Sequence, residues 1–382
     1  MIVAGEASGD MHGAHLVRAM LKQQPDLVFY GMGGVELGAA GVELLYDARK
    51  LAVVGAVEVF SHLADIIAAQ RLLKKRMKQD RPRLLILIDF PDFNLMLARK
   101  AKRLGIPVFY YVSPQVWAWR SGRVKTIGRL VDAIGVILPF EEQFYRDRKV
   151  DAHYVGNPLL DSVHVEMSRD AFVSRYEIDP DHKIVGLFPG SRKKEISALL
   201  PTFLEAAKRM QQKYQKHIVF LLSLASTITE DDLKESGLEE YRQFVDIRLV
   251  RQNRYDMMAA CDAAVTKSGT VTLELAILNV PMVVVYKVSP STYFLGRLLV
   301  KVKNFSLVNL IAGDFVVPEL LQEQANPGSI EVELAFLLFD EYTRKKMQEG
   351  LALVRARLGA PGASDQAARL ALGILKPAIV TD

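Results

Sequence analysis

Two loops in the second half of the chain have the composition of phosphate-binding turns. Pro189-Gly190-Ser191-Arg192 separates an apolar run, typical of a buried strand, from a helical pattern, and Lys267-Ser268-Gly269-Thr270 repeats this order. Backbone N–H groups at a helix start are unpaired and lie at the positive end of its dipole, so they bind anions. An ordinary strand-to-helix turn with a surface arginine would show the first pattern too. The repetition favours a nucleotide diphosphate held by both loops.

An arginine and a carboxylate complete this predicted nucleotide site. Arg192 would add a forked positive charge. Glu274, one turn inside the second helix, could accept hydrogen bonds from ribose hydroxyls. The residues predicted to bind the nucleotide are Gly190, Ser191, Arg192, Ser268, Gly269, Thr270 and Glu274.

Asp89 is the candidate general base. It directly follows the apolar run Leu84–Ile88, whose lack of alternation predicts a strand covered on both faces, as in a parallel sheet. Ligands bind at the carboxyl ends of such strands, where a carboxylate could take a proton from an acceptor hydroxyl. The alternative is a structural acceptor at Asp89, with Asp92 or Asn94 capping the next helix.

Two further loops carry candidates for contacts with an acceptor. The loop Gly5–Asp10 matches neither the dinucleotide fingerprint nor the P-loop, which argues against a dehydrogenase or a kinase. Its Asp10 could also simply cap the next helix. The loop Ser113–Ser121 holds both tryptophans of the chain, which suits a sugar or an acylated ligand, although anchoring in the core is equally ordinary. The acceptor-side candidates are Glu6, Ser8, Asp10, Asn94, Gln115, Trp117 and Arg120.

Cationic amphipathic segments in both halves predict contact with an anionic membrane surface. One spans residues 293–303, and the other spans 53–67 and runs into a basic stretch. Surface helices packed on their own core have the same pattern. The membrane-facing candidates are Val57, Phe60, Leu63, Phe294, Arg297, Leu298 and Lys301.

Several classes of protein are disfavoured. None of the seven histidines forms a metal-ligand pattern, so we expect no metal and no cofactor. The single cysteine, Cys261, excludes an intramolecular disulfide and fits a reducing compartment. No apolar run reaches the ~18 residues of a spanning helix, and acidic residues interrupt the N-terminal apolar stretch, unlike a secretory signal. The net charge of +5 suits an anionic substrate or membrane surface, and we expect no nucleic-acid partner.

The elements that must position these residues form a repeating strand and helix pattern. At 382 residues the chain is longer than one core usually organises. The pattern pauses near Gly156–Pro158, where we place the interdomain link, and predicts two α/β Rossmann-like domains, each a doubly wound parallel sheet, facing across a cleft. Strands are predicted at 1–4, 27–31, 84–88, 106–112, 133–138, 184–188, 218–223, 245–249, 263–266 and 282–286.

The order of the motifs closely resembles that of the lipid-A-disaccharide synthases, over nearly the whole length. The motifs are Gly-Glu-Ala-Ser-Gly-Asp at 5–10, Ile-Asp-x-Pro-Asp-Phe-Asn at 88–94, Tyr-Val-Ser-Pro-x-Val-Trp-Ala-Trp-Arg at 111–120, Leu-Pro-Phe-Glu at 138–141, Pro-Gly-Ser-Arg at 189–192, Ser-Gly-Thr-x-x-Leu-Glu at 268–274 and Ser-Leu-x-Asn-Leu-x-Ala-Gly at 306–313. Each alone is weak, but the ordered set is highly specific. Two residues depart from the expected pattern: Phe90 replaces a small residue, and Lys267 precedes Ser-Gly-Thr.

The resemblance implies a glycosyltransferase of the GT-B fold that acts in lipid A assembly in a Gram-negative bacterium. UDP-2,3-diacylglucosamine would be joined to 2,3-diacylglucosamine 1-phosphate (lipid X) by a β-1,6 link, with inversion and loss of UDP. Asp89 matches the proposed base, Arg192 and Ser268–Thr270 the nucleotide site, and Glu274 the ribose contact. Asn309, nearby, is a further nucleotide-binding candidate that the resemblance implies. Neither a metal nor another cofactor is implied, because arginine and helix N-termini can neutralise the leaving group.

The resemblance also implies a domain division and a location. Residues 1–160 would form the acceptor and membrane-facing domain, and 161–354 the UDP-sugar domain. The helical tail, about 355–382, would return to the first domain, and its exchange between protomers would give a homodimer. The enzyme would be cytoplasmic and peripheral, on the cytoplasmic face of the anionic inner membrane.

Two rival hypotheses stay open at the level of sequence. A UDP-N-acetylglucosamine 2-epimerase or the transferase that builds the peptidoglycan lipid precursor would share the fold, but an epimerase would not need apolar patches. A catalytically silent nucleotide-binding or membrane-scaffold protein is the second. Acyl-chain length selectivity cannot be predicted, because pocket depth depends on side-chain packing.

Overall fold

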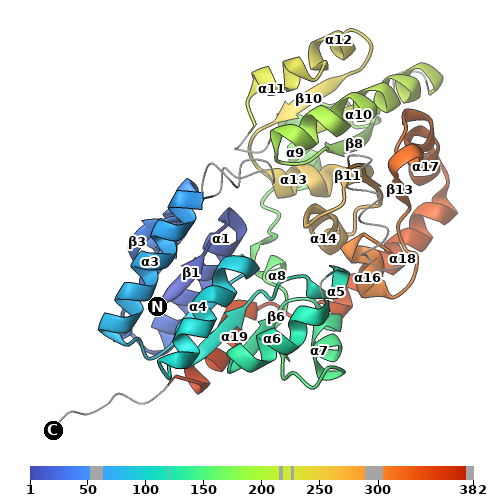
Figure 1. Ribbon diagram of the computed structural model, residues 1–382. Helices are drawn as coiled ribbons and strands as arrows, with labels where there is room; N and C mark the ends of the chain where they lie inside the picture. Colours follow the sequence, from blue (N-terminus) through green and yellow to red (C-terminus); the bar gives the residue numbers. More distant parts are fainter. Residues whose placement is uncertain (52–62, 120, 215–217, 225–227, 289–303, 376–382) are drawn as a thin grey trace. The chain divides into compact units, whose positions relative to one another are not determined.

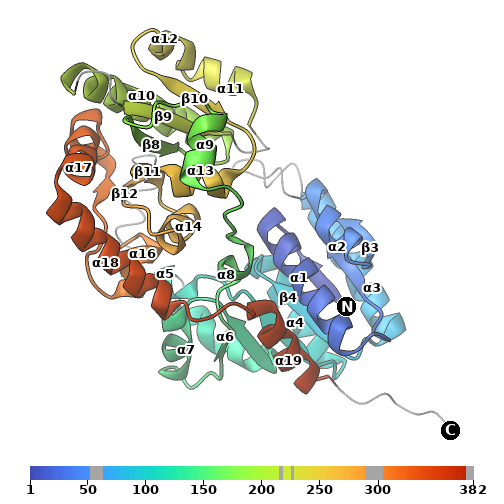
Figure 2. The ribbon, with the colours of Figure 1, turned by 180° about the vertical axis from the view of Figure 1, so that it is seen from behind.

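The chain folds into two compact units, each built on one parallel sheet (Figures 1 and 2). The computed structural model describes residues 1–51, 63–119, 121–214, 218–224, 228–288 and 304–375. Unit 1 comprises Met1–Leu160 and Ala360–Asp382, and unit 2 comprises Asp161–Gly359. Two parallel-sheet α/β units are what the sequence predicts.

Unit 1 contains a seven-stranded sheet in the order β3-β2-β1-β4-β5-β6-β7. Its strands are β1 (Ile2–Ala4), β2 (Tyr30–Gly33), β3 (Glu43–Asp47), β4 (Leu85–Ile88), β5 (Val108–Tyr111), β6 (Ala133–Val136) and β7 (His153–Tyr154). Its helices are α1 (Ala7–Gln23), α2 (Val35–Ala39), α3 (Leu63–Asp80), α4 (Pro91–Arg103), α5 (Val116–Trp119), α6 (Val124–Leu130), α7 (Pro139–Arg146), α8 (Leu159–Ser162), which crosses into unit 2, and α19 (Ala363–Gly373).

Both faces of this sheet are covered by helices, which makes the unit doubly wound. Leu85 and Leu87 of β4 face a core shared with α3, α4 and α6. Ile86 and Ile88 face a second core shared with α1, α2 and α19. The two faces are seen from opposite sides in Figures 1 and 2. The unbroken apolar run of β4 therefore reflects burial on both sides.

The C-terminal helix belongs to unit 1 although the preceding helix belongs to unit 2. α19 packs along α1, and three of its alanines, Ala367, Ala368 and Ala371, are fully buried in the core that also holds Leu16 and Met20. Small side chains at this contact let the two helices approach closely.

Unit 2 contains a six-stranded sheet in the order β10-β9-β8-β11-β12-β13. Its strands are β8 (Lys183–Phe188), β9 (Ile218–Ser223), β10 (Ile247–Val250), β11 (Ala263–Lys267), β12 (Met282–Tyr286) and β13 (Glu319–Leu321). Its helices are α9 (Arg169–Arg175), α10 (Lys193–Lys213), α11 (Glu230–Glu235), α12 (Leu238–Arg242), α13 (Arg254–Ala260), α14 (Val271–Ile277), α16 (Leu307–Ala312), α17 (Pro327–Phe339) and α18 (Glu341–Arg357).

The sequence missed three strands and displaced a fourth. β3, β7 and β13 lie at sheet edges and have mostly half-buried or exposed side chains, so they lack the apolar run used to find strands. The strand predicted at 27–31 begins only at Tyr30 and extends to Gly33. Before Tyr30, Phe29 is buried in the core and Leu27 packs against it, although neither belongs to the strand.

The close approach of β1 and β2 gives a test of the unit 1 sheet. A Cβ atom added at Gly31 would lie 1.8 Å from the carbonyl oxygen of Ile2. Gly31→Ala should lower the unfolding free energy by about 3 kcal/mol, because backbone atoms cannot move aside as side chains do. Both tryptophans of the chain lie in unit 1, so tryptophan fluorescence during urea unfolding measures this unit.

Gly373→Ala is the matched control. It lies at the end of α19, nothing lies within 4 Å of the added Cβ, and alanine favours helix by up to about 1 kcal/mol. Equal stability of Gly31→Ala and the wild-type protein would contradict the strand pairing described here.

Candidate active site

The backbone is strained where Asp89 leaves the first sheet. Asp89 and Phe90 both have φ of 44°, and Val112, which follows the neighbouring strand β5, has φ of 54°. Non-glycine residues rarely adopt these left-handed values, least of all a β-branched valine. Such strain persists only where the surroundings enforce it, and it gathers at functional sites. The carboxyl ends of β4 and β5 are therefore the first candidate site.

Two buried side chains hold this strained turn. The amide Nδ2 of Asn94 donates to the carbonyl oxygens of Ile88, at 3.1 Å, and of Asp89, at 2.8 Å. The hydroxyl of Tyr110 donates to the same Asp89 carbonyl at 2.7 Å. Asn94 is predicted from the sequence as an acceptor contact or a helix cap. The structure instead commits both of its N–H donors to the backbone that positions Asp89.

The carboxyl of Asp89 has properties suited to a base. Burial raises the pKa of Asp89 to about 6, helped by the negative charge of Glu6 and opposed by the N–H of Phe90. Glu6 is exposed and follows β1, which pairs with β4 through Ala4 and Ile88. A carboxyl with a pKa near 6 is ionised at neutral pH yet binds a proton better than an ordinary aspartate.

Phe90, which departs from the family pattern, is accommodated by Gly5. A Cβ atom at Gly5 would lie 2.4 Å from Cδ1 of Phe90. The Phe90 ring also stacks on Phe93, with centroids 5.2 Å apart. The glycine that opens the first motif therefore leaves room for the aromatic ring beside the candidate base.

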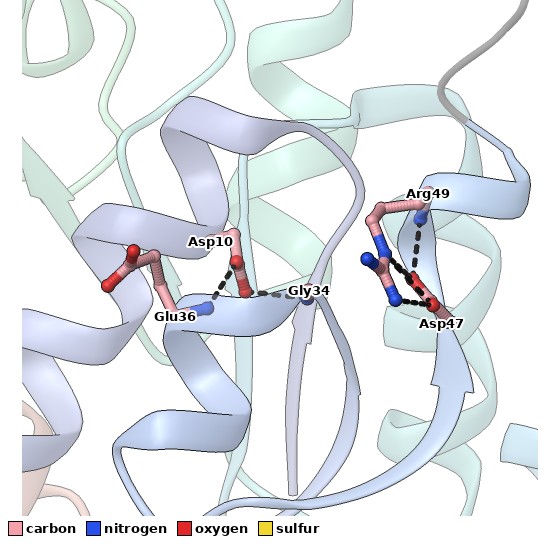
Figure 3. A network of polar contacts seen from close by, with 5 residues as sticks. All are labelled: Asp10, Gly34, Glu36, Asp47 and Arg49. Atoms are coloured by element: carbon pink, nitrogen blue, oxygen red, sulfur yellow. Dashed lines mark hydrogen bonds and ion pairs between the residues drawn. The ribbon is translucent and has the colours of Figure 1, made fainter. Parts of the chain in front are cut away.

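Asp10 has a structural role that the sequence only half predicted. Its carboxylate accepts hydrogen bonds from the N–H groups of Gly34 (2.6 Å), Glu36 (2.9 Å) and Leu37 (3.2 Å), as Figure 3 shows in part. It is buried, and it caps α2 although it lies inside α1. Asp10 therefore caps a helix in place of the predicted contact with an acceptor, and the helix is a different one from that expected.

Figure 3 also shows the ion pair between Asp47 and Arg49. The distance between its closest atoms is 2.6 Å.

The rest of the first motif is shorter as a loop than predicted. α1 already begins at Ala7, so the predicted loop Gly5–Asp10 is reduced to its first two residues. Glu6 and Ser8 are exposed at this end of the helix. They keep their place as acceptor-side candidates.

The buried acid Glu141 anchors the loop after β5. Nε1 of Trp117 donates to Glu141 at 3.1 Å, and the N–H of Leu138 donates to the other Glu141 oxygen at 3.0 Å. Burial raises the pKa of Glu141 to about 7, although these N–H donors act to lower it. The anchoring alternative therefore holds for Trp117. Gln115 is exposed, and Arg120 lies outside the described residues.

In unit 2, Gly190–Arg192 forms the predicted turn between β8 and α10. Gly190 has φ of 127°, and Arg192 is the N-cap residue, with its side chain 75% exposed. The N–H of Ser191 donates to Oε2 of Glu195 at 3.1 Å. A Cβ at Gly190 would lie 2.4 Å from that oxygen, and a φ of 127° is one that other residues rarely adopt, so glycine is favoured at this position.

The second predicted loop follows β11 and leads into α14. The hydroxyl of Ser268 donates to the carbonyl of Phe305 at 3.0 Å, and Thr270 is the N-cap residue of α14. Glu274 is buried and forms an ion pair with Arg254. Burial raises the pKa of Glu274, and the Arg254 charge opposes the shift. Arg254, which the sequence analysis did not single out, is thus the first partner of the residue predicted to contact ribose.

Asn309 holds the structure around this loop. Its Oδ1 accepts from the N–H groups of Val316 and Val317, and its Nδ2 donates to the Val317 carbonyl and to Oε1 of Glu319. These four bonds use the full capacity of the amide. A direct nucleotide contact by Asn309, which the resemblance implied, would require breaking them. Glu319 also accepts from the N–H of Phe305, which links Asn309 to the Ser268 loop.

The predicted membrane-facing residues fall mostly outside the part of the chain that is described. Leu63, at the start of α3, is 47% exposed. Outside the described residues lie Val57, Phe60, Phe294, Arg297, Leu298 and Lys301. Among helices of the described segments, none is both long and apolar enough to span a bilayer. Within the same segments, no cluster of three or more His, Cys, Asp or Glu side chains has a metal-binding arrangement.

Comparison with known proteins identifies the family. A family model described as lipid-A-disaccharide synthetase matches residues 1–371. The lipid-A-disaccharide synthase of Syntrophus aciditrophicus is 50% identical over 376 residues, covering 98% of this chain and 97% of the relative. That of Geobacter sulfurreducens is 48% identical over 379 residues, with 98% and 97% covered. The chain belongs to the lipid-A-disaccharide synthase family. The resemblance inferred from the motifs is thereby confirmed, and the chain is a hexosyltransferase.

Solved structures confirm the GT-B fold and nothing finer. The calicheamicin glycosyltransferase CalG4 superposes with a TM-score of 0.61 at 15% identity, covering 98% of each chain. MurG of Acinetobacter baumannii gives 0.60 at 15% identity, covering 98% of this chain and 99% of that one. UDP-GlcNAc 2-epimerase of Neisseria meningitidis gives 0.61 at 9%, covering 96% and 97%. Transferases and epimerases match equally well, so the fold alone does not separate them.

The contact between Gly5 and Phe90 yields a double-mutant test. Gly5→Ala should lower the unfolding free energy of unit 1 by about 1–3 kcal/mol, because the added methyl group overlaps the Phe90 ring. In a Phe90→Ser background the same change should cost close to nothing. Urea unfolding followed by tryptophan fluorescence gives the coupling free energy. Equal costs in both backgrounds would contradict the packing.

Proposed function

We propose that the chain transfers diacylglucosamine from UDP-2,3-diacylglucosamine to 2,3-diacylglucosamine 1-phosphate, giving lipid A disaccharide 1-phosphate and UDP. The observation that carries the chemistry is Asp89: a partly buried carboxyl with a pKa near 6, held in a strained turn at the carboxyl end of a parallel strand. The substrates are those that the family name implies.

The reaction needs one displacement at the anomeric carbon. The 6-hydroxyl oxygen of the acceptor bonds to C1 of the donor sugar while the bond from C1 to the UDP oxygen breaks, which inverts the configuration. Asp89 of unit 1 takes the hydroxyl proton. UDP leaves as an anion, and unit 2 supplies the groups suited to hold it: the turn Gly190–Arg192, Arg192 itself and the Ser268–Thr270 loop. Electrostatic stabilisation of this kind needs no metal ion.

The lipid nature of both substrates supports a peripheral position on an anionic membrane. The exposed Leu63 at the start of α3 fits such a contact, and the enzyme would work at the cytoplasmic face of the inner membrane. Exchange of the C-terminal tail between two protomers stays a prediction, which the mass of the protein in solution would test.

Substitution of Asp89 tests the proposed function directly. Asp89→Asn should reduce transfer by about 10²–10⁴-fold, because the base is removed, while UDP binding is kept. Purified protein with both lipid precursors, followed by mass analysis of the product, measures transfer, and calorimetry measures UDP binding. Turnover of unacylated UDP-N-acetylglucosamine by the wild-type protein would favour an epimerase. Membrane association as the only activity would favour a scaffold.

Asp89→Asn should also stabilise the protein at neutral pH. Because the pKa of Asp89 is raised from 3.8 to about 6 on folding, the folded state binds the proton more tightly, and stability falls as pH rises between these values. Removing this charge should add about 3 kcal/mol to the unfolding free energy at pH 7. A destabilised variant would instead indicate a structural role.

The pH dependence of transfer gives a further test. Since Asp89 must be ionised to act as a base, kcat/KM should rise as pH increases through about 6. Glu6→Gln removes the negative charge that helps to raise this pKa, so the acid limb should move to lower pH. Arg123→Gln, which releases the exposed Asp92 from an ion pair of 2.5 Å, is the control. If the acid limb of the pH profile of kcat/KM is identical in the wild-type and Glu6→Gln proteins, the assignment of this limb to Asp89 is contradicted.

A further inference from the structure

A side-chain bridge joins the two loops predicted to bind the nucleotide. Nζ of Lys267, the last residue of β11, lies 2.8 Å from Oε1 of Glu195 in the first turn of α10. β8 and β11 are adjacent parallel strands, paired through Phe188 and Thr266, so their carboxyl ends lie at the same edge of the sheet. Both residues belong to unit 2.

The carboxylate in this bridge lies against the anion-binding turn itself. Its other oxygen, Oε2, accepts the N–H of Ser191, and Nη1 of Arg192 lies 3.8 Å from Oε1. Burial would raise the pKa of Glu195, but bonds from Lys267 and Ser191 with the Arg192 charge outweigh burial and lower it. Glu195 is therefore ionised, and the turn already holds an anion that the chain supplies.

We propose that Lys267 is a diphosphate-binding cation of the donor site, located beside Glu195 at the turn. An ammonium has three N–H donors, and the contact with Glu195 uses one, so the others can be donated to phosphate oxygens. The ligand class is a nucleoside diphosphate. This inference rests on the proposed function, in which unit 2 holds the UDP sugar. It gives a role to the residue that departs from the family pattern in the second loop.

The competing explanation is a strut that only holds the two loops together. The two explanations differ in what each partner contributes. A strut needs both side chains, so losing either would have the same effect on stability and on binding. If Lys267 binds the diphosphate, its positive charge attracts the ligand and the negative charge of Glu195 repels it. Removing the Lys267 charge should therefore weaken UDP binding, and removing the Glu195 charge should not.

Calorimetry of the full chain with UDP and with uridine tests the proposal. Lys267→Met should raise the Kd for UDP about tenfold, the size expected for loss of a charge-assisted hydrogen bond, and leave the Kd for uridine unchanged. Lys267→Arg should restore most of the affinity. Glu195→Gln keeps an oxygen for the N–H of Ser191, and UDP should bind it as tightly as the wild type or up to a few-fold more tightly. Lys183→Met, the same charge change at the opposite end of β8, is the control.

If the wild-type protein binds UDP, two results would overturn the proposal. One is a Kd for UDP in Lys267→Met within twofold of the wild type. The other is an equal loss of UDP affinity and of Tm in Lys267→Met and Glu195→Gln, which identifies a strut. A wild-type protein that does not bind UDP overturns the donor site and this inference together. Wild-type binding with an unaffected Lys267→Met variant overturns this inference alone.

Discussion

Burial of parallel strands on both faces is the constraint on which the rest of this structure depends. The side chains of β4 are entirely enclosed between two helical layers, so a polar group can reach a ligand only where the strand ends. The same holds in unit 2 for β8, which is buried from Ile184 to Phe188. The candidate base and the turn predicted to bind anions therefore both follow the last residues of a buried strand.

The strained turn at Asp89 shows how a fixed strand end is converted into a site. A left-handed backbone at Asp89 and Phe90 costs free energy, which the hydrogen bonds from Asn94 and Tyr110 to the Asp89 carbonyl offset. Both donors are buried, and both come from elements that the sheet already holds in place. The position of the carboxyl is thus set by rigid neighbours.

The features that depend on composition along the chain could be predicted from the sequence. Unbroken apolar runs predicted the central strands, and polar residues at their ends predicted where Asp89 and the Gly190 turn would lie. The roles of residues whose partners lie elsewhere along the chain could not be predicted in this way. Nothing local to Asp10 indicates that it caps a helix more than twenty residues away, with Gly34 as its nearest partner. The four bonds of Asn309 likewise depend on a loop whose path the sequence does not reveal.

The edge strands could not be predicted for a related reason. β3, β7 and β13 have neighbours on one side only, so their side chains need not be apolar. What identifies them is the backbone pairing with an adjacent strand, such as Tyr286 of β12 with Leu321 of β13. Pairing of this kind is a property of the assembled sheet.

The candidate base, Asp89, differs from four other acidic residues in the partners of its carboxyl group. Asp10 accepts three backbone N–H groups, Glu141 accepts two N–H groups, and Glu274 and Glu195 are paired with cations. Among the groups that shift the pKa of Asp89 there is a negative charge, from Glu6, and no cation. A cation beside Asp89 would lower its pKa and weaken it as a base. Transfer of a sugar from a diphosphate needs the opposite environment at the leaving group, and in unit 2 the cations Arg192 and Lys267 lie beside the Gly190 turn. The two environments belong to two different sheets, one in each unit.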